Sequence, residues 1–477
     1  MSTFITGGRL VTEVDSYEAS LLVEDGLIQA VGRDLAPPDD AEIYNVAGKL
    51  VMPGVVDVHV HVGLDLRGRR SSDFETTTRE AAFGGVTTFL TYAMPAKGQT
   101  LLEAVESRLE EARGSSYVDF GAHAALVNWS EREDEEIPEL IEAGVPSFKM
   151  FTVYSREGWK SGEEDLYRAL LLTGRHGGLV EVHCENEWII ERKIRRLVAE
   201  GRLSALDHAR SRPSYVEGEA VSNVLRVAYD AAAPVYIVHV SSGQAVEAIA
   251  EARELGVEVY AETCPHFLLL DESDLEGPLG HRKATCPPLR PPTHREALWE
   301  ALEDGSIQVV ATDHAEFRAA DKDAGAGDFR EIPMGVPGVG TLLPLMWHYG
   351  VGEGRMTENE LVDRLCTEPS EIFGLQPSKG TLKAGSDADI VVFDPELRET
   401  VSPELLHGYA DYSPYDGFEV RGWPVSTMVR GSWVVKDREL VGGRDHGTFV
   451  HRGPVCQRPG RRPDRVAGGA GPRDTGD

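Results

Sequence analysis

The segment VVDVHVHVGLD, residues 55–65, contains the pattern around which the rest of the chain is organised. Its first residues are mostly apolar and β-branched, which favours a buried strand. Side chains two residues apart on a strand share a face, so His59 and His61 point the same way. Two imidazoles on one face can bind one metal ion. A pair of hydrogen-bonded core histidines would give the same pattern, and the rest of the chain must distinguish the two.

The composition describes an acidic protein of ordinary apolar content. Among 477 residues, 41% are apolar and 27% are charged, and 48 basic against 79 acidic residues give a net charge of −31. Nucleic acids and anionic membranes attract clusters of Lys and Arg, so we expect neither as a partner. The length exceeds what one compact core accommodates, which predicts a large domain and a smaller one.

The cysteines and the first residues indicate a cytoplasmic location. The five cysteines are dispersed and none forms a CxxC pair, which argues against a thiolate zinc site or a redox pair. The opening MSTFITGGRLV lacks the basic and apolar regions of a secretory signal. No apolar run is long enough to span a bilayer.

Eight strand-like apolar runs alternate with amphipathic segments between residues 52 and 375. The runs cover residues 55–61, 86–94, 118–127, 145–151, 179–186, 235–242, 257–264 and 307–315. Helical periodicity appears between them, for example in residues 101–113, 163–177, 220–232, 243–256 and 295–305. Eight such units predict a parallel (β/α)8 barrel. An open doubly wound sheet also uses these units, but the glycine-rich turn typical of its first strand is missing.

The two ends of the chain predict a second, smaller unit. Residues 1–51 and 376–453 contain short apolar runs separated by Gly and Asp turns, which is typical of antiparallel strands. We expect them to form one β-sandwich into which the barrel, residues 52–375, is inserted. Residues 454–477 are rich in Gly, Pro, Arg and Asp, which predicts a disordered tail or an arm that orders on a neighbouring subunit.

Metal-binding and titratable side chains occur near the ends of five barrel runs. Barrel active sites form at the C-terminal ends of the strands, so these side chains should meet on one rim. The six residues are His59, His61, Lys149, His183, His239 and Asp313.

Lys149 is the unusual member of this set, because an ammonium group is repelled by a divalent cation and its burial is costly. Reaction of its amine with carbon dioxide would give an anionic carbamate that can bridge two metal ions. His59, His61 and Asp313 would then bind one ion, and His183 and His239 the other. A lysine that extends outward from the strand end is the alternative.

The donor set predicts both the metal and its chemistry. Nitrogen and oxygen ligands without thiolate favour zinc, with manganese, cobalt or iron as alternatives. Two ions that share a water lower its pKa, so that hydroxide forms near neutrality. Asp313 can accept the proton of the attacking hydroxide and return it to a leaving nitrogen.

These motifs resemble the amidohydrolase superfamily, and within it the cyclic amidases dihydropyrimidinase, D-hydantoinase and allantoinase. The resemblance extends from about Phe4 to Gly453 and includes MPGVVDVHVH, FKMFTVY, CPPLR, VVATDHA and KGTLKAGSDADIVVFDP. It implies the barrel with its β-sandwich and a binuclear centre with carboxylated Lys149. It also implies hydrolytic opening of a small cyclic amide, a dihydropyrimidine or a 5-substituted hydantoin, by a homotetramer or dimer.

The resemblance also implies residues that contact the substrate. Tyr154 occupies the position of a tyrosine that donates to the developing oxyanion. Cys286 stands where a serine usually contacts the ring, and Met334 stands where an asparagine is common. In the family, much of these two contacts is made by the backbone, so the substitutions need not abolish binding.

The segments near the expected site suggest how its mouth is built. Leu64 and Leu66 can form an apolar lip for a ring substituent, and Trp159 can wall the pocket or be an ordinary surface aromatic. Arg67, Arg69 and Arg70 could attract an anionic substituent, but we expect them to be solvated, as exposed arginines usually are.

Three related functions fit the sequence less well. Dihydroorotase typically carries an arginine two residues after the histidine pair, where this chain has Gly63. Allantoinases generally lack a tyrosine corresponding to Tyr154. Non-catalytic scaffold relatives have lost metal ligands, whereas this chain retains all six candidates.

Overall fold

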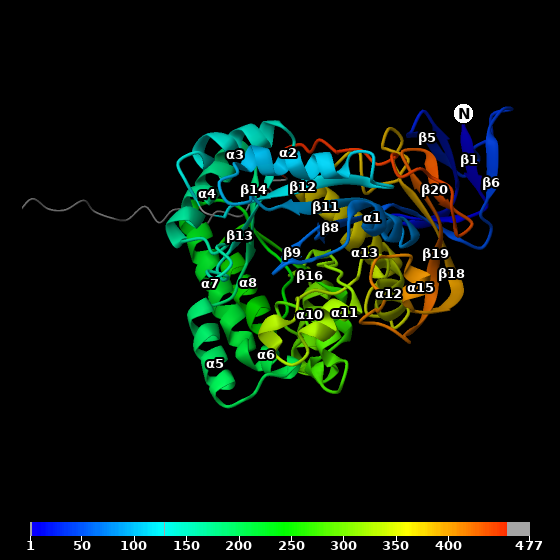
Figure 1. Cartoon of the computed structure of the whole chain (residues 1–477). Helices are drawn as coiled ribbons and strands as arrows, with labels where there is room; N and C mark the ends of the chain where they lie inside the picture. Colours follow the sequence, from blue (N-terminus) through cyan, green and yellow to red (C-terminus); the bar gives the residue numbers. More distant parts are fainter. Residues whose placement is uncertain (1, 128, 456–477) are drawn as a thin grey trace, which may run out of the picture.

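The computed structural model describes residues 2–127 and 129–455, which form a barrel with helices around it and a group of sheets at one side (Figure 1). The first part of the VVDVHVHVGLD segment forms β8 (Val55–Val60), and all six residues of this strand are buried. Seven further parallel strands continue the sheet in chain order. They are β11 (Val86–Ala93), β12 (Asp119–Ala125), β13 (Ser147–Phe151), β14 (Leu179–His183), β15 (Val235–Ile237), β16 (Val259–Thr263) and β17 (Val309–Val310).

The barrel closes where β8 meets the segment that follows β17. Val60 and His314 form a parallel bridge, the His61 amide donates to the His314 carbonyl at 2.7 Å, and the His314 amide donates to the His59 carbonyl at 3.2 Å. The expected (β/α)8 barrel is therefore confirmed. The closing contact also brings the histidine pair beside Asp313.

Helices cover the outside of the barrel, and the five predicted from amphipathic segments all form. The longer ones are α1 (Phe74–Phe83), α2 (Leu101–Ala112), α3 (Glu133–Glu142), α4 (Glu163–His176), α5 (Glu187–Ala199), α6 (Ala205–Ser211), α7 (Ser214–Ala231), α8 (Gly243–Glu254), α10 (Pro292–Glu303) and α11 (Ala319–Ala324). Local sequence sets their ends: Thr100 and Glu103 form a capping box at the start of α2. Gly177, with φ of 81°, ends α4 in the left-handed conformation.

Short helices complete the connections. They are α9 (Pro265–Leu269), α12 (Leu342–Leu345), α13 (Glu358–Val362), α14 (Glu368–Ile372) and α15 (Pro403–Leu406). Short 3-10 helices lie at Glu272–Leu275, Gly280–Lys283 and Phe329–Glu331. Short π-helices lie at Met346–Val351 and Asp363–Thr367. Among residues 2–127 and 129–455, none of the helices combines the length and the apolar character needed to cross a bilayer.

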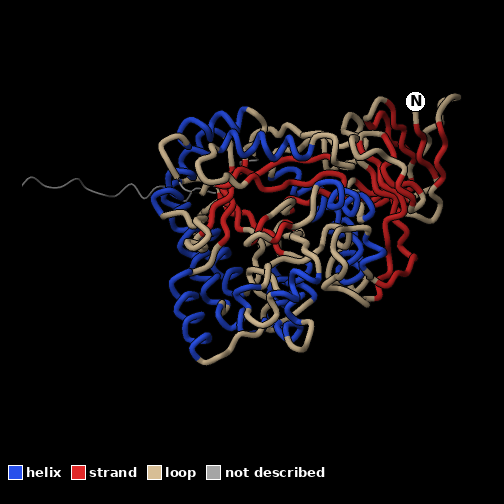
Figure 2. The backbone as a smooth tube through the Cα atoms, in the orientation of Figure 1, coloured by secondary structure: helices blue, strands red, loops and turns tan. Residues whose placement is uncertain are grey.

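Strands from both ends of the chain build the second unit, where Figure 2 shows them gathered beside the barrel. One sheet contains β1 (Thr3–Thr6), β4 (Ser20–Glu24), β5 (Leu27–Gly32) and β6 (Glu42–Asn45). The other contains β2 (Arg9–Val11), β3 (Ser16–Glu18), β7 (Leu50–Pro53), β18 (Ile390–Thr400), β19 (Glu419–Val429), β20 (Ser432–Lys436) and β21 (Glu439–Leu440).

The two ends of the chain share one core in this unit. β7 pairs antiparallel with β18 and parallel with β2. Leu21, Val51, Ile390 and Met428 belong to the same buried apolar cluster. This arrangement confirms that the barrel is inserted into a sandwich made from both ends, and the expected boundary after residue 51 falls inside β7.

The last described residues run beneath the barrel, at the end opposite the candidate rim. The Phe120 amide donates to the Thr448 carbonyl at 3.0 Å, and the Val450 amide donates to the Phe120 carbonyl at 2.9 Å. The buried guanidinium of Arg452 donates to the Ala122 carbonyl. The tail predicted for residues 454–477 lies outside the described residues from residue 456 onward.

A buried ion cluster joins the barrel to the sandwich. Lys379 Nζ lies 2.6 Å from Asp119 Oδ2, 2.9 Å from Asp387 Oδ2 and 2.8 Å from Asp389 Oδ2. Asp119 begins the barrel strand β12, whereas the two other carboxylates immediately precede β18. Burial alone would lower the pKa of Lys379, but the carboxylates raise it, so the lysine stays charged.

Replacing this lysine should weaken the fold more than replacing an exposed one. Lys379→Met leaves the buried Asp389 carboxylate without its cation and leaves Asp119 paired with Arg430 alone, so we expect about 3–5 kcal/mol of destabilisation. Lys383→Met is the matched control: its side chain is 71% exposed and pairs with Glu13 at 3.2 Å, so its effect should stay within about 1 kcal/mol. Chemical denaturation followed by tryptophan fluorescence measures both variants, and equal losses would contradict the role given to Lys379.

Candidate active site

A cavity of about 590 Å³ opens at the rim formed by the C-terminal ends of the barrel strands. Every residue that the sequence analysis proposed for the site lines this cavity. These residues are His59, His61, Leu64, Leu66, Lys149, Tyr154, Trp159, His183, His239, Cys286, Asp313 and Met334.

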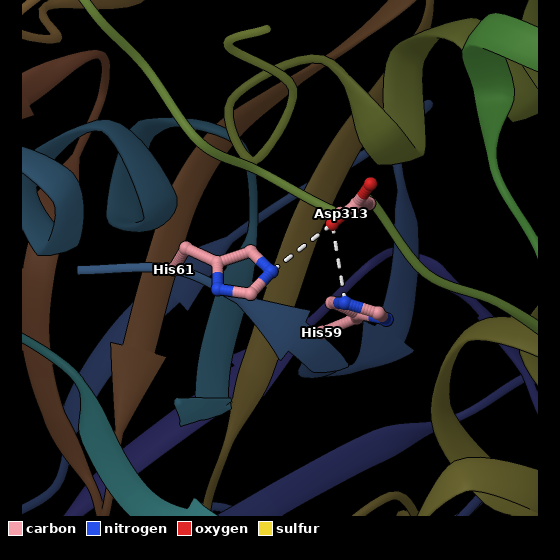
Figure 3. Close-up of side chains that lie close together, drawn as sticks. All are labelled: His59, His61 and Asp313. Atoms are coloured by element: carbon pink, nitrogen blue, oxygen red, sulfur yellow. Dashed lines mark ion pairs between the residues drawn. The ribbon is translucent and has the colours of Figure 1, made fainter. Parts of the chain in front are cut away.

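His59, His61 and Asp313 lie close together (Figure 3), and all three line the cavity. Asp313 Oδ1 lies 3.1 Å from His59 Nε2 and 3.2 Å from His61 Nε2. One ligand atom from each residue lies within 4.8 Å of the others, a spacing at which one metal ion can be held. His59 lies in β8, His61 follows directly after this strand, and the segment after β17 supplies Asp313.

The charges of this group are set by burial and by close neighbours. Burial lowers the pKa of His61 to about 4, which leaves its imidazole neutral. Burial alone would also lower the pKa of His59, but the Glu262 and Asp313 carboxylates raise it to about 9. Burial alone would raise the pKa of Asp313, but the two histidines hold it well below its usual range. An anionic oxygen beside imidazole nitrogens suits a divalent cation.

Lys149, His183 and His239 form the adjoining part of the cavity floor. Lys149 is 1% exposed, and no described residue forms a hydrogen bond with its Nζ, which lies 5.0 Å from the centre of the Tyr92 ring. The rings of His183 and His239 are 4.5 Å apart, and burial lowers the pKa of both. Within the described chain, His239 Nδ1 also lacks a hydrogen-bond partner. Neutral imidazoles and an unpartnered buried amine fit a metal centre in which the amine is modified.

Two buried carboxylates that the sequence analysis missed orient these histidines. Glu262 accepts a hydrogen bond from His59 Nδ1, from the Tyr236 hydroxyl at 2.8 Å and from the His239 amide at 3.2 Å. His59 Nε2 is thereby left facing Asp313 and the cavity. A carboxylate behind a histidine fixes its tautomer and raises its basicity as a metal ligand.

Glu185, just after the fifth barrel strand β14, acts in the same way on His183. Its Oε2 accepts from His183 Nε2 at 2.9 Å and from the buried guanidinium of Arg212. Because of Arg212 and His183, the pKa of Glu185 lies below its usual range although burial opposes this. Glu185 follows His183 by two residues, a spacing that was visible in the sequence. Arg212 comes from the loop between α6 and α7 and had no such signal.

Tyr154 and Cys286 contact each other at the wall of the cavity. The Tyr154 hydroxyl lies 2.8 Å from Cys286 Sγ and donates to it, and burial raises the pKa of Tyr154, so the hydroxyl keeps its proton. Tyr154, His239 and Asp313 have φ values of 76°, 40° and 48°. Such left-handed conformations cost about 1–3 kcal/mol each and cluster at functional sites.

The segments that carry Cys286 and Met334 are joined by one buried carbonyl. The Ala284 oxygen accepts from Lys322 Nζ at 2.9 Å and from the Gly335 amide at 3.1 Å. Lys322 is fully buried, and burial lowers its pKa well below the usual value. The hydrogen bond from the Gly335 amide joins the two walls of the cavity, and Lys322 holds the shared carbonyl in place.

Arg67 and Arg70 at the mouth are exposed to solvent, and the arginines of this loop also pair with neighbouring groups. Arg67 and Arg70 are 41% and 61% exposed, yet both are paired. Arg67 Nη1 lies 3.3 Å from Glu331 Oε1, and Arg69 donates to the Glu331 carbonyl. They tie the hairpin of β9 (Asp65–Leu66) and β10 (Arg69–Arg70) to the segment across the mouth, because the tertiary fold brings Glu331 opposite this hairpin.

Comparisons with known proteins agree on one family. The model of the amidohydrolase family matches residues 50–434. The chain is 39% identical over 457 residues to a D-hydantoinase of Geobacillus stearothermophilus, covering 95% of this chain and 97% of that protein. It is 35% identical to a D-phenylhydantoinase of Escherichia coli O127:H6, covering 95% and 99%. The crystal structure of a dihydropyrimidinase from Brevibacillus agri NCHU1002 superposes with a TM-score of 0.94 at 36% identity, covering 96% of this chain and 100% of that chain.

Removing the charge behind His59 should weaken metal binding without unfolding the barrel. Glu262→Gln keeps the size of the side chain but replaces the anion that orients His59, so we expect the affinity for added Zn²⁺ to fall about 10–100-fold. Competition with a chelator measures this affinity. Glu251→Gln, at an exposed position on α8, is the control. Equal affinities in the two variants would contradict the role given to Glu262.

Proposed function

The chain belongs to the amidohydrolase family, and we propose that it hydrolyses the cyclic amide bond of 5-substituted hydantoins or dihydropyrimidines. The observation that carries this proposal is the convergence of four histidines, a buried lysine and Asp313 on one cavity floor. The relatives named D-hydantoinase and dihydropyrimidinase support the same substrate class over nearly the whole chain.

We propose a binuclear centre held by the six residues of the sequence prediction. His59, His61 and Asp313 would hold one ion, His183 and His239 the other, and a carbamate on Lys149 would bridge them. Zinc is the expected metal, with manganese, cobalt or iron as alternatives. When bound, the ions supply a Lewis acid for the ring carbonyl and a water of lowered pKa.

The surroundings of Lys149 support its carboxylation. Burial lowers the pKa of the amine, which favours the neutral form that attacks carbon dioxide. The new N–C bond gives a carbamate and releases one proton. The product is an anion, which two divalent cations stabilise, whereas an ammonium at this place would repel them.

Asp313 is proposed to move the proton that ring opening requires. Asp313 directly precedes His314, whose backbone closes the barrel against β8. Its carboxylate stays ionised because the two histidines lower its pKa. It can accept a proton from the attacking water and deliver it to the amide nitrogen as the carbon–nitrogen bond breaks. The left-handed backbone at Asp313 directs its carboxylate into the cavity.

Tyr154 is proposed to stabilise the negative charge that develops on the carbonyl oxygen. Its hydroxyl keeps its proton and already donates to Cys286 at the cavity wall. A bound substrate would take this hydrogen bond in place of the thiol. Cys286 and Met334 would contact the ring through their backbones, with Leu64, Leu66 and Trp159 around its substituent.

We also propose a homotetramer or dimer in the cytoplasm. The assembly follows from the resemblance to the cyclic amidases. A reducing compartment is supported by the four described cysteines, which are all free: Cys184, Cys264, Cys286 and Cys366.

A ring-opening assay tests the proposed function directly. Protein reconstituted with Zn²⁺, Mn²⁺ or Co²⁺ in bicarbonate should open dihydrouracil and a 5-substituted hydantoin but not allantoin. Lys149→Ala should lose both turnover and bound metal, because the bridge between the ions is gone. Substrate absorbance and metal content measure the two losses. Hydrolysis of allantoin alone, or full activity without metal, would overturn the proposal.

Tyr154→Phe tests the oxyanion contact separately. Loss of one oxyanion donor should lower kcat about 10²–10³-fold, while the metal content stays unchanged because Tyr154 is not among the ligands. Steady-state kinetics with dihydrouracil measures the effect. A variant with unchanged kcat would show that the hydroxyl is not used.

A further inference from the structure

The cavity continues well beyond the residues of the proposed reaction, along helix α5. Seven residues from α5 line it, from Glu187 to Ala199. At 1.5 Å per residue, this stretch is about 18 Å long. Pockets of roughly 300–1,000 Å³ usually hold drug-sized ligands, and this one measures about 590 Å³. A bare five- or six-membered ring at the metal centre would leave much of it unfilled.

The α5 side of this extension carries an apolar stripe. Ile190, Ile194 and Val198 recur every four residues and therefore lie along one face of the helix. All three line the cavity. The charged residues Glu191 and Arg195 flank the stripe at exposed positions, so the interior is apolar and the edge is polar.

The facing side comes from the segment that precedes Met334. Phe329, Ile332 and Pro333 line the cavity there, and Phe329 and Ile332 are buried. The Phe329 amide donates to the Leu203 carbonyl at 2.9 Å, which joins this segment to the chain just after α5. The extension therefore has two apolar walls that are linked by a hydrogen bond.

The apolar stripe begins at the reacting centre. Ile190 packs in one cluster with Val153, and Tyr154 and Ile194 pack against that cluster. Glu187, at the start of the stripe, is engaged by Ser155 and by Lys160 at 3.0 Å, so its charge is already paired. A substituent on a ring beside Tyr154 would thus meet apolar side chains first.

We propose that the groove between α5 and residues 329–333 is a binding subsite for a long apolar substituent on the cyclic amide. This inference rests on the proposed function and specifies its substrate: a ring that carries an arylalkyl chain, with the distal end of the chain near Val198. Burial of each additional methylene on the chain contributes to transition-state binding until the third turn of α5 is reached.

Two tryptophan substitutions can measure the depth of the subsite. The substrates are dihydrouracil, 5-benzylhydantoin and 5-(4-phenylbutyl)hydantoin. Ile194→Trp fills the groove at its middle and should lower kcat/KM for the phenylbutyl compound about tenfold or more relative to that for dihydrouracil. Val198→Trp, one turn farther, should lower only the phenylbutyl value and spare 5-benzylhydantoin. Arg192→Trp, on the same helix but outside the cavity, should change none of them.

The outcomes separate this subsite from the proposed function. If wild-type protein opens dihydrouracil but shows no preference for the longer chain, or if the tryptophan variants lower all three values equally, the subsite is wrong and the function stands. If wild-type protein opens none of the rings, the proposed function fails first. Turnover of dihydrouracil by each variant also shows that the variant is folded.

Discussion

A lysine amine buried among histidines and carboxylates is the constraint on which the rest of the site depends. Lys149 lies on a central barrel strand with no hydrogen-bond partner for its Nζ in the described chain. A buried ammonium without a hydrogen-bond partner is costly, whereas the nearby Glu181 and Glu262 carboxylates already pair with His123 and His59. Conversion of the amine to a carbamate adds a further negative charge, which only bound cations can balance. In the proposed centre, lysine carboxylation and metal binding would therefore support each other.

The supporting groups around this centre make it rigid before any ligand arrives. Glu262 holds His59 and the backbone of His239, and Glu185 holds His183 while Arg212 holds Glu185. Each carboxylate leaves one histidine nitrogen free for the cavity, so tautomers are set by the fold.

The opposite end of the barrel carries the contacts with the sandwich. There the C-terminal segment and the ions around Lys379 attach the sandwich to the barrel base, away from the rim where the strands end.

Specificity is expected to come from loops and helix α5 and not from the strands. The hairpin that carries Leu64 and Leu66 is tied by Arg67 to Glu331, and the following residues form the second wall of the groove beside α5. One set of contacts thus connects the lip of the cavity with its distal wall. A ring at the metal centre and a substituent in the groove would be bound by different elements, so the groove can change without disturbing the chemistry.

The sequence by itself determined the barrel, the sandwich and the positions of the six candidate ligands. These features follow from local periodicity: alternation put His59 and His61 on one face, and eight repeated units led to a closed sheet whose strand ends meet. Only the tertiary structure decided which side chains support them. The pairing of Glu262 with His59, the contact of Arg67 with Glu331 and the groove along α5 join segments far apart in the chain. Local sequence specifies the conformation and exposed face of each segment, but long-range contacts depend on how the packed segments lie in space, and no residue pattern records that.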